Sequence, residues 1–284
     1  MKETIKNLGK RFSQDFGLIP VISFEIEFYL MGPVAPDDFP ERLQERLLAE
    51  KIPLYKVEKE KGPNQFEIAL AHGPNIPGIT ESLVKAKTII REYAEEIGSR
   101  ASFAAKPYPN HPGSGLHMHL SLYDRQGKNV FAKHGDGETE TMLHAIGGLL
   151  AALPESMIYF APNPESYARF IAVYHPESET YDNAPTKITW GANNRTTAIR
   201  IPESTASPEN RHIEHRVPGV DADPYQVTAA ILAGVHYGLV NKINPGEKIY
   251  GNAYDAQYKL PELPGSLAEA EKLNREGEIL SRYF

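Results

Sequence analysis

The 284-residue sequence has no cysteine, no long apolar run and no excess of basic residues. Without cysteine, disulfide bonds, thiolate metal ligands and cysteine nucleophiles are excluded. No run approaches the ~18 apolar residues of a membrane span, and the N-terminal segment lacks the continuous apolar core of a secretory signal. A net charge of −7 argues against a general nucleic-acid binder, which needs a basic surface. We therefore expect a cytoplasmic protein that binds neither membrane nor nucleic acid.

The composition is that of an ordinary globular chain. Hydrophobic residues make up 41% and charged residues 24% of the sequence, and the length suffices for one large domain or two small ones. We find no internal repeat, no low-complexity tract and no shift of composition that would mark a boundary. The sequence therefore predicts a single domain over residues 1–284.

Two histidines alternate with apolar residues in the stretch GSGLHMHLSL, residues 113–122. Alternation with a period of two is typical of a strand that has one polar and one apolar face. His117, His119 and Ser121 should then share the polar face. Neighbouring imidazoles on a strand suit metal or phosphate chemistry, although an ordinary strand with one solvated face would show the same pattern.

Carboxylates repeat this arrangement elsewhere. In the predicted strand 18–30, Glu25 and Glu27 alternate with apolar residues, and Glu67 follows Glu60 across a Gly-Pro turn. Carboxylates on one face repel each other unless a positive charge lies between them. A solvated face remains the plain alternative, and a divalent cation is the sharper one, because hard cations bind carboxylate oxygens.

The remaining segments mostly predict helices. Apolar stripes and capping residues indicate helices over 37–50, over 80–98 with Thr80 as cap, over 138–153 with its end before Pro154, from Asp223 to about Val240, and from Ser266 onward. Residues 160–186 are predicted to form a long irregular loop, a kind of segment that is often functional.

Arginines lie close to these polar strand faces. Arg195 and Arg200 flank a predicted short strand, Arg216 shares a face with Glu214, and Arg169 lies in the long loop. A guanidinium binds phosphate and carboxylate groups with two parallel hydrogen bonds. Any of these arginines alone would by default be a surface residue. Together with the carboxylates and imidazoles they favour a phosphoryl-transfer site with two divalent ions, Mg²⁺ or Mn²⁺.

Seven segments of the chain resemble, in order, the catalytic domain of the glutamine synthetase family. They are FEIEF (24–28), EKGPNQFEI (60–68), KPYPNHPGSGLHMHLSL (106–122), SYARF (166–170), APTKITWGANNRTTAIRIP (184–202), IEHRVPGVDADPY (213–225) and LPGSLAEA (263–270). The sequence of the fifth segment is similar to that of the family branch that joins glutamate to amines larger than ammonia, such as γ-glutamylpolyamine synthetases.

The resemblance implies a role for each matching position. It implies one metal ion held by Glu27, Glu60 and Glu67 and a second held by Glu25, His117 and Glu214, with two to three ions per site. It implies contacts to glutamate from Gly113 and Arg169, to the transferring phosphate from Arg195 and Arg200, and to the nucleotide from His119, Ser121 and Arg216. The catalytic flap carboxylate of the family aligns best with Asn183, so that Glu177, Glu179 or Asp182 in the preceding loop could substitute for it, and Asp182 is the one counted among the predicted catalytic residues.

The fold implied by the resemblance is α+β, with an antiparallel sheet curved around the site and helices packed outside. The implied chemistry has two steps, in which ATP phosphorylates the γ-carboxylate of glutamate and an amine then displaces phosphate. The implied partners are ATP, an acid and an amine, and the family also implies homo-oligomers. The family's N-terminal β-grasp domain has no counterpart in this sequence, and Pro112 replaces an asparagine near glutamate.

Three functions follow from these features. The first is an ATP-dependent ligase that forms a γ-glutamyl amide with an amine other than ammonia. The second is a catalytically degenerate protein that binds metal or nucleotide and acts through partners. The third is a kinase of a carboxylate or guanidino compound. We favour the ligase, because degenerate proteins tend to lose costly unpaired carboxylates first.

Overall fold

The computed structural model describes the chain except for residues 134, 136, 176–179, 182 and 204–206. The longer elements are α1 (Lys2–Asp15), β1 (Ile19–Met31), α2 (Phe39–Ala49), β2 (Leu54–Lys59), β3 (Gln65–Leu70), α3 (Ile76–Glu96), β5 (Leu116–Tyr123), α4 (Glu140–Phe160), α5 (Pro224–Asn241) and α6 (Leu267–Glu276). Short ones are β4 (Arg100–Ser102), η1 (Pro164–Phe170), β6 (Tyr174–His175), β7 (Thr180–Tyr181), β8 (Trp190–Ala192), β9 (Ile199–Ile201), η2 (Pro208–Asn210), β10 (Ile213–His215) and η3 (Leu280–Arg282).

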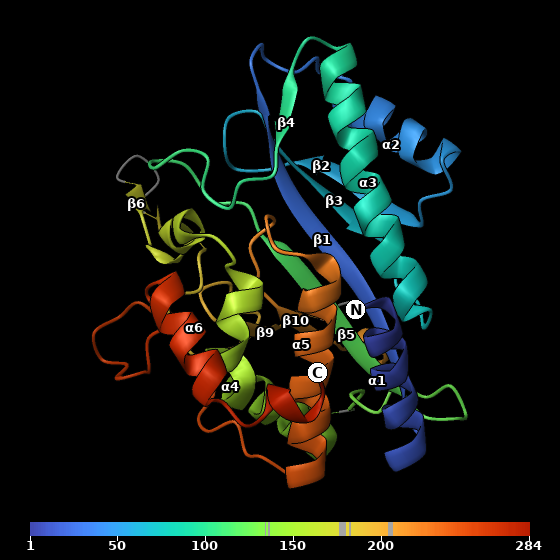
Figure 1. Cartoon of the computed structure of the whole chain (residues 1–284), viewed down its shortest axis with the longest axis vertical. Helices are drawn as coiled ribbons and strands as arrows, with labels where there is room; N and C mark the ends of the chain where they lie inside the picture. The colour runs from blue at the N-terminus through green and yellow to red at the C-terminus, as the bar shows by residue number, and fades with distance from the viewer. Residues whose placement is uncertain (134, 136, 176–179, 182, 204–206) are drawn as a thin grey trace.

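One open sheet organises the molecule. Its strand order is β2-β3-β1-β5-β10-β9-β8, and β4 pairs with β1 beside this path. All pairs are antiparallel apart from β8 with β9, which run parallel. Figure 1 shows helices α1, α3, α4 and α5 on the side of the sheet that faces the viewer. The predicted α+β class, with an antiparallel sheet and helices outside it, is therefore confirmed, and the parallel edge pair is the exception.

Strand β1 separates the core from the polar face of the sheet. Phe24, Ile26 and Phe28 are completely buried, whereas Glu25 and Glu27 alternate with them and point to the opposite face. Helix α3 contacts β1 on the apolar side. The apolar residues that alternate in the sequence of β1 therefore belong to the core, and the glutamates between them belong to the polar face.

Helix α3 begins four residues earlier than the sequence predicted. Asn75 is its N-cap, with Oδ1 accepting a hydrogen bond from the Gly78 amide at 3.2 Å. Thr80 is not a cap but lies inside the helix, where its buried hydroxyl donates to the Ile76 carbonyl at 2.9 Å. Ile76 and Ile79 extend the apolar stripe by one turn, which favours the longer helix.

Helix α4 runs through Pro154 to Phe160, so the predicted end before this proline is wrong. Proline removes one helical hydrogen bond, at a cost of about 3 kcal/mol, but Leu153, Met157 and Phe160 on both sides of it are buried. By length and composition α4 could cross a membrane, which the search for apolar runs had not indicated. Of its most apolar window 61% is buried within the protein, as in a core helix.

The helix starts at Asp223 and Ser266 agree with the sequence. The Asp223 carboxylate accepts hydrogen bonds from the amides of Tyr225 and Gln226 at the start of α5, both at 2.9 Å. Ser266 Oγ accepts from the Glu269 amide at 3.3 Å, while Glu269 reaches back to the Gly265 amide at 2.8 Å. Both ends therefore follow ordinary capping chemistry.

The turn between β2 and β3 fixes how the two strands pair. The Glu60 amide donates to the Gln65 carbonyl at 2.8 Å, and a Cβ on Gly62 would overlap the hydroxyl of Tyr29. At the far end of β2 the register shifts between Leu54 and Lys56, so that Tyr55 forms a β-bulge. The strand therefore holds a strict register from Lys56 to the turn.

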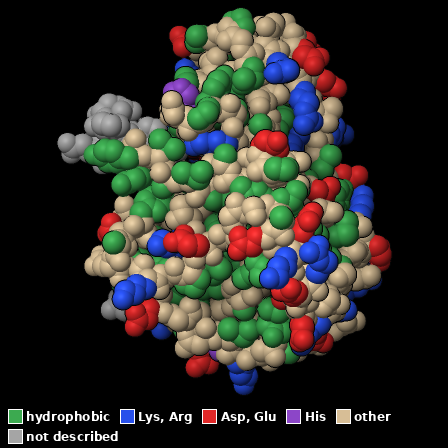
Figure 2. Space-filling view, turned by 60° about the vertical axis from the view of Figure 1, so that its left-hand side comes forward, with side chains coloured by type: hydrophobic (Ala, Val, Ile, Leu, Met, Phe, Trp, Pro, Cys, Tyr) green, Lys and Arg blue, Asp and Glu red, His purple; other side chains and the backbone are tan. Residues whose placement is uncertain are grey.

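The surface carries charges of both signs. Figure 2 shows acidic and basic side chains interspersed over one face of the molecule.

Candidate active site

Strand register brings three carboxylates into one line. Glu58 of β2 is opposite Glu67 of β3, and Glu67 is opposite Glu27 of β1. Directly opposed side chains in a sheet lie about 5 Å apart, and like charges in such positions repel. We call Glu58, Glu67 and Glu27 the acidic row.

A second group lies along the neighbouring positions of the same face. Glu25 of β1 is opposite His117 of β5, while His119 is opposite Glu214 of β10 and Glu214 opposite Arg200 of β9. We call this group, together with Arg216, the paired cluster. Its members alternate in charge, in contrast to the acidic row.

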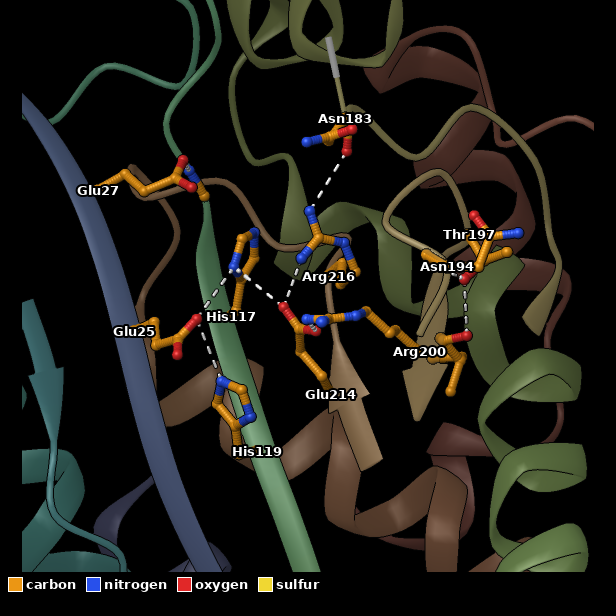
Figure 3. A network of polar contacts seen from close by, with 12 residues as sticks. Glu25, Glu27, His117, His119, Asn183, Asn194, Thr197, Arg200, Glu214 and Arg216 are labelled. Atoms are coloured by element: carbon orange, nitrogen blue, oxygen red, sulfur yellow. Dashed lines mark hydrogen bonds and ion pairs between the residues drawn. The ribbon is translucent and has the colours of Figure 1, made fainter. Parts of the chain in front are cut away.

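The paired cluster is closely connected (Figure 3). His117 Nδ1 lies 3.7 Å from Glu25 Oε2 and 3.5 Å from Glu214 Oε1, and His119 Nε2 lies 3.3 Å from Glu25 Oε2. Arg200 donates to Glu214 Oε2 at 2.7 Å, and Arg216 donates to Glu214 Oε1. The buried Glu214 therefore has two guanidinium partners and one imidazole neighbour.

These neighbours shift the pKa values in the paired cluster. Burial acts to raise the pKa of Glu214, but Arg216 and the two imidazoles outweigh it and hold that pKa well below its usual range. Burial also acts to raise the pKa of Glu25, but the neighbouring imidazoles of His119 and His117 outweigh it and lower that pKa. Burial and the charge of Arg216 lower the pKa of His117 to about 4. Both carboxylates are thus ionised at neutral pH, and the His117 ring is neutral, as a metal ligand must be.

The acidic row behaves in the opposite way. Burial, with a further contribution from the charge of Glu60, raises the pKa of Glu27 to about 7. Burial and the charges of Glu25 and Glu27 also raise the pKa of Glu67. The Gly115 amide donates to Glu27 Oε2 at 2.7 Å, which does not offset the loss of hydration. The positive charge near these carboxylates is therefore too small to offset their burial and mutual repulsion.

Among the residues that the structure describes, three groups of side chains bring their donor atoms within 4.8 Å of one another. They are Glu25–His117–Glu214, Glu27–Glu67–His117 and Glu58–Glu60–Glu67. The first is the set predicted for the second ion. Glu27, Glu60 and Glu67, predicted for the first ion, do not form one such group among the residues described; Glu67 instead links Glu27 to Glu60.

The donor chemistry fits hard divalent ions. Oxygen-rich sets with one imidazole suit Mg²⁺ or Mn²⁺ better than a structural zinc ion. Glu27 and Glu67 are directly opposed carboxylates, and a bound divalent ion would hold both of them ionised. The residues present therefore fit the metal ions that the sequence implied.

A cavity opens beside the acidic row. Its walls include Glu27, Glu60, Gly113, Arg169 and Arg195. A Cβ on Gly113 would lie 2.8 Å from both the Ala105 carbonyl oxygen and Arg169 Cγ, so a side chain at this position would displace the arginine. The predicted glutamate contacts, Gly113 and Arg169, thus meet at one wall.

Arg169 is fixed by its own hydrogen bonds. Its Nη1 donates to the Val217 carbonyl at 2.7 Å and its Nη2 to the Arg216 carbonyl at 3.0 Å. Burial lowers the pKa of Arg169 to about 10, which leaves it cationic at neutral pH. A fixed positive charge next to the cavity suits an anionic substrate.

A second cavity, of about 440 Å³, lies along the strands behind Glu25. Its walls include His119, Ser121 and His212. The ring centroids of His119 and His212 are 5.1 Å apart, and Ser121 donates to the Arg211 carbonyl at 3.1 Å. The predicted nucleotide contacts His119 and Ser121 therefore share one space.

The arginines are distributed differently from the prediction. Arg216 was grouped with His119 and Ser121, but it lines the cavity beside the acidic row and donates to the Asn183 carbonyl at 3.3 Å. Arg195 does not flank a single strand with Arg200: it lies in the turn between β8 and β9 and lines the same cavity as Arg216.

Arg200 is engaged within the protein. It lies in β9, and its Nη2 donates to Asn193 Oδ1 at 2.6 Å, besides the bond from Nη1 to Glu214. Asp182, the predicted catalytic carboxylate, lies outside the described residues.

Two functional candidates escaped the sequence analysis. Glu58 completes the acidic row, and Lys56 lies 3.4 Å from Glu67 Oε1 and donates to Glu58. Both alternate with Val57 in β2, so the period of two could have placed them on the polar face. Only the pairing of β2 with β3 shows that this face is the site.

Comparisons with known proteins identify the family of the chain. Residues 35–284 match the family described as "Glutamine synthetase, catalytic domain". The chain is 32% identical over 301 residues to gamma-glutamylputrescine synthetase PuuA of Escherichia coli, covering 94% of this chain and 61% of that protein. It is 37% identical over 201 residues to glutamine synthetase of Aquifex aeolicus, covering 69% of this chain and 41% of that protein.

A solved structure of GmaS in complex with ADP is similar to the whole fold. The TM-score is 0.83 at 25% identity, over 99% of this chain and 69% of that one. The chain thus spans between two-fifths and about two-thirds of the length of these proteins.

Proposed function

We propose that this chain, which belongs to the glutamine synthetase family, carries the catalytic site of an ATP-dependent ligase that joins glutamate to an amine in the cytoplasm. The observation that carries the proposal is the strand register. It aligns the acidic row and the paired cluster on one sheet face between two cavities, and Arg169, Arg195 and Arg216 line the cavity beside the row. The similarity to a synthetase named for γ-glutamylputrescine supports an amine larger than ammonia.

In the first step the γ-carboxylate of glutamate attacks the γ-phosphate of ATP, the bond to ADP breaks, and an acyl phosphate forms. Two anions must approach each other, so positive charge has to be fixed in place beforehand. Arg169 and Arg195 line the cavity beside Gly113 and would bind the acid there. His119 and Ser121 line the second cavity, where the nucleotide would bind.

Divalent ions, held by the paired cluster and the acidic row, would neutralise the phosphate oxygens of ATP. In the paired cluster Glu25, His117 and Glu214 would be their ligands, and in the acidic row Glu27 and Glu67 with Glu60. The chain's part is to present these ligands in the correct protonation state. Arg216 and Arg200 keep Glu214 ionised, and each of them also donates a hydrogen bond to one of its carboxylate oxygens.

In the second step the nitrogen of an amine attacks the acyl carbon, phosphate leaves, and the nitrogen loses a proton. The amine would enter beside Glu60 and Asn183, which line the cavity next to Arg169. A carboxylate at the cavity wall suits a cationic amine. The group that takes the proton is not assigned, because Asp182 and its neighbours 176–179 lie outside the described residues.

The test is ADP release with Mg²⁺, ATP and glutamate across ammonium, methylamine, ethanolamine and putrescine. We expect one amine to give turnover, and Glu27→Gln to reduce it about 100-fold or more because a metal ligand is lost. Glu81→Gln is the matched control, because Glu81 is exposed and pairs with Lys2 away from the site. Metal-dependent binding of ATP without turnover on any amine would contradict the ligase and favour a non-catalytic role. Phosphorylated acid that accumulates without an amine would instead indicate a kinase.

A further inference from the structure

Lys56 is the one cation found in direct contact with the acidic row among the residues that the structure describes. Its Nζ donates to Glu58 Oε1 and lies 3.4 Å from Glu67 Oε1. The Glu67 side chain is 6% exposed, whereas that of Lys56 is 35% exposed. The ammonium therefore reaches from the sheet edge towards a buried carboxylate.

The position of Lys56 follows from the strand. Lys56 and Glu58 are two residues apart in β2 and so share a face, and Glu58 is opposite Glu67. The same two carboxylates, together with Glu60, form one of the groups whose donor atoms lie within 4.8 Å of one another. An ammonium and a divalent ion would therefore use the same carboxylates.

We propose that Lys56 is a tethered counter-ion of the acidic row, which stabilises the row without a divalent ion and competes with the ion when it binds. This inference rests on the proposed function, since it assumes that the row binds Mg²⁺ or Mn²⁺. Lys56 is a positioning residue rather than a catalytic one, because it acts through Glu58 and Glu67. Its unit charge beside a doubly charged ion weakens binding through Coulomb repulsion.

The competition has a functional consequence. A row without any cation would bind a divalent ion very tightly and release it slowly. With Lys56 present, the ion is exchanged for an internal charge instead of leaving three neighbouring carboxylates unpaired. The site can then lose and regain its ion without unfolding the edge of the sheet.

The test compares Lys56→Met with Lys59→Met. Lys59 lies in the same strand on the opposite face and pairs with Asp37 at 3.5 Å, so both variants lose one positive charge and only one of them loses it at the row. Mn²⁺ binding is measured by calorimetry, and the melting temperature is measured with a chelator and with saturating Mn²⁺.

We expect Lys56→Met to bind Mn²⁺ at least fivefold more tightly than the wild type and to melt at a lower temperature in the chelator. The shift in melting temperature on adding Mn²⁺ should then be larger than in the wild type. Lys56→Arg keeps the charge and should stay within about twofold of the wild-type affinity, which guards against a failure of Lys56→Met to fold.

The outcomes separate the two hypotheses. If the wild type binds Mn²⁺ and Lys56→Met changes the affinity no more than Lys59→Met does, the counter-ion role is wrong while the metal site stands. Weaker binding by Lys56→Met would also overturn it, since Lys56 would then be orienting the ligands. If the wild type binds no divalent ion, both this inference and the proposed metal-dependent ligase fail.

Discussion

The acidic row and the paired cluster are neighbours on one sheet face, yet the pKa values of their carboxylates shift in opposite directions. In the paired cluster Glu214 has Arg200, Arg216 and His117 around it, and its pKa falls. In the acidic row Glu27 has another carboxylate as its nearest strand neighbour, and its pKa rises to about 7. The difference separates a carboxylate that has counter-charges around it from a carboxylate that is opposed by another carboxylate.

The largest effect should come from removing a cation of the paired cluster. Arg216→Met leaves the buried Glu214 with one guanidinium partner instead of two. Breaking a buried ion pair on one side costs about 3 kcal/mol of unfolding free energy, measurable by urea denaturation. Adding Glu214→Gln should recover part of the loss. If the double variant is less stable than Arg216→Met, the guanidinium supports the fold in some other way than by pairing with Glu214.

The pH dependence of stability should distinguish the two groups next. Glu27 has a folded pKa raised to about 7 by burial and by Glu60, so it adds stability below its unfolded pKa of about 4.5. This contribution is lost as the pH rises through 7. In a chelator, the wild type should therefore lose about 2 kcal/mol relative to Glu27→Gln between pH 5 and 8. If the unfolding free energies of the two proteins, measured by urea denaturation, instead change in parallel across this pH range, Glu27 is in contact with solvent.

Neutralising the middle of the acidic row should stabilise the metal-free protein. Glu67→Gln removes a carboxylate whose strand neighbours on both sides are also carboxylates, and we expect a gain of about 1 kcal/mol at pH 7.5. The stabilisation by Mn²⁺ should shrink in the same variant. Thermal denaturation with and without Mn²⁺ measures both effects. A loss of stability in the chelator would show that the contact between Glu67 and Lys56 outweighs the repulsion along the row.

The smallest effect should lie at the exposed end of the paired cluster. Asn193 has a left-handed backbone, with φ of 47°, and its Oδ1 accepts from Arg200 at 2.6 Å. Asn193→Gly leaves this backbone conformation unstrained. It removes the hydrogen bond from Arg200 and the one that Asn193 Nδ2 donates to Glu203 Oε2 at 3.2 Å, at a cost of about 0.5 kcal/mol. An effect as large as that of Arg216→Met would mean that Arg200 is held chiefly by Asn193 and not by Glu214.

The sequence was sufficient for each strand taken alone. Period-two alternation correctly put Glu25 with Glu27 and His117 with His119 on polar faces, because the two faces of a strand follow from backbone geometry. The capping residue Asp223 likewise marked the start of α5. These are local properties, in which a few neighbouring residues determine the outcome.

The relations between strands could not be read in the same way. The acidic row depends on how β2, β3 and β1 are offset, and Glu58 was overlooked because its pairing with Glu67 is a tertiary fact. That Arg216 lines the cavity beside the acidic row, and not the one that contains His119 and Ser121, is a tertiary fact of the same kind. Helix α4 passes Pro154 because buried neighbours offset the lost hydrogen bond, an effect that local propensity does not contain.

The bulge at Tyr55 and the turn at Gly62 have a consequence for insertions and deletions in the gene. Removing the single codon for Tyr55 would take out the bulge and leave Glu58 opposite Glu67 and Lys56 opposite Ala69, because the turn sets their pairing. Removing one codon within the turn would shift β2 by one position and exchange Lys56 and Glu58 for Tyr55 and Val57 at the site. The two deletions lie close together in the gene, yet the first leaves the acidic row unchanged and the second replaces Glu58 in it.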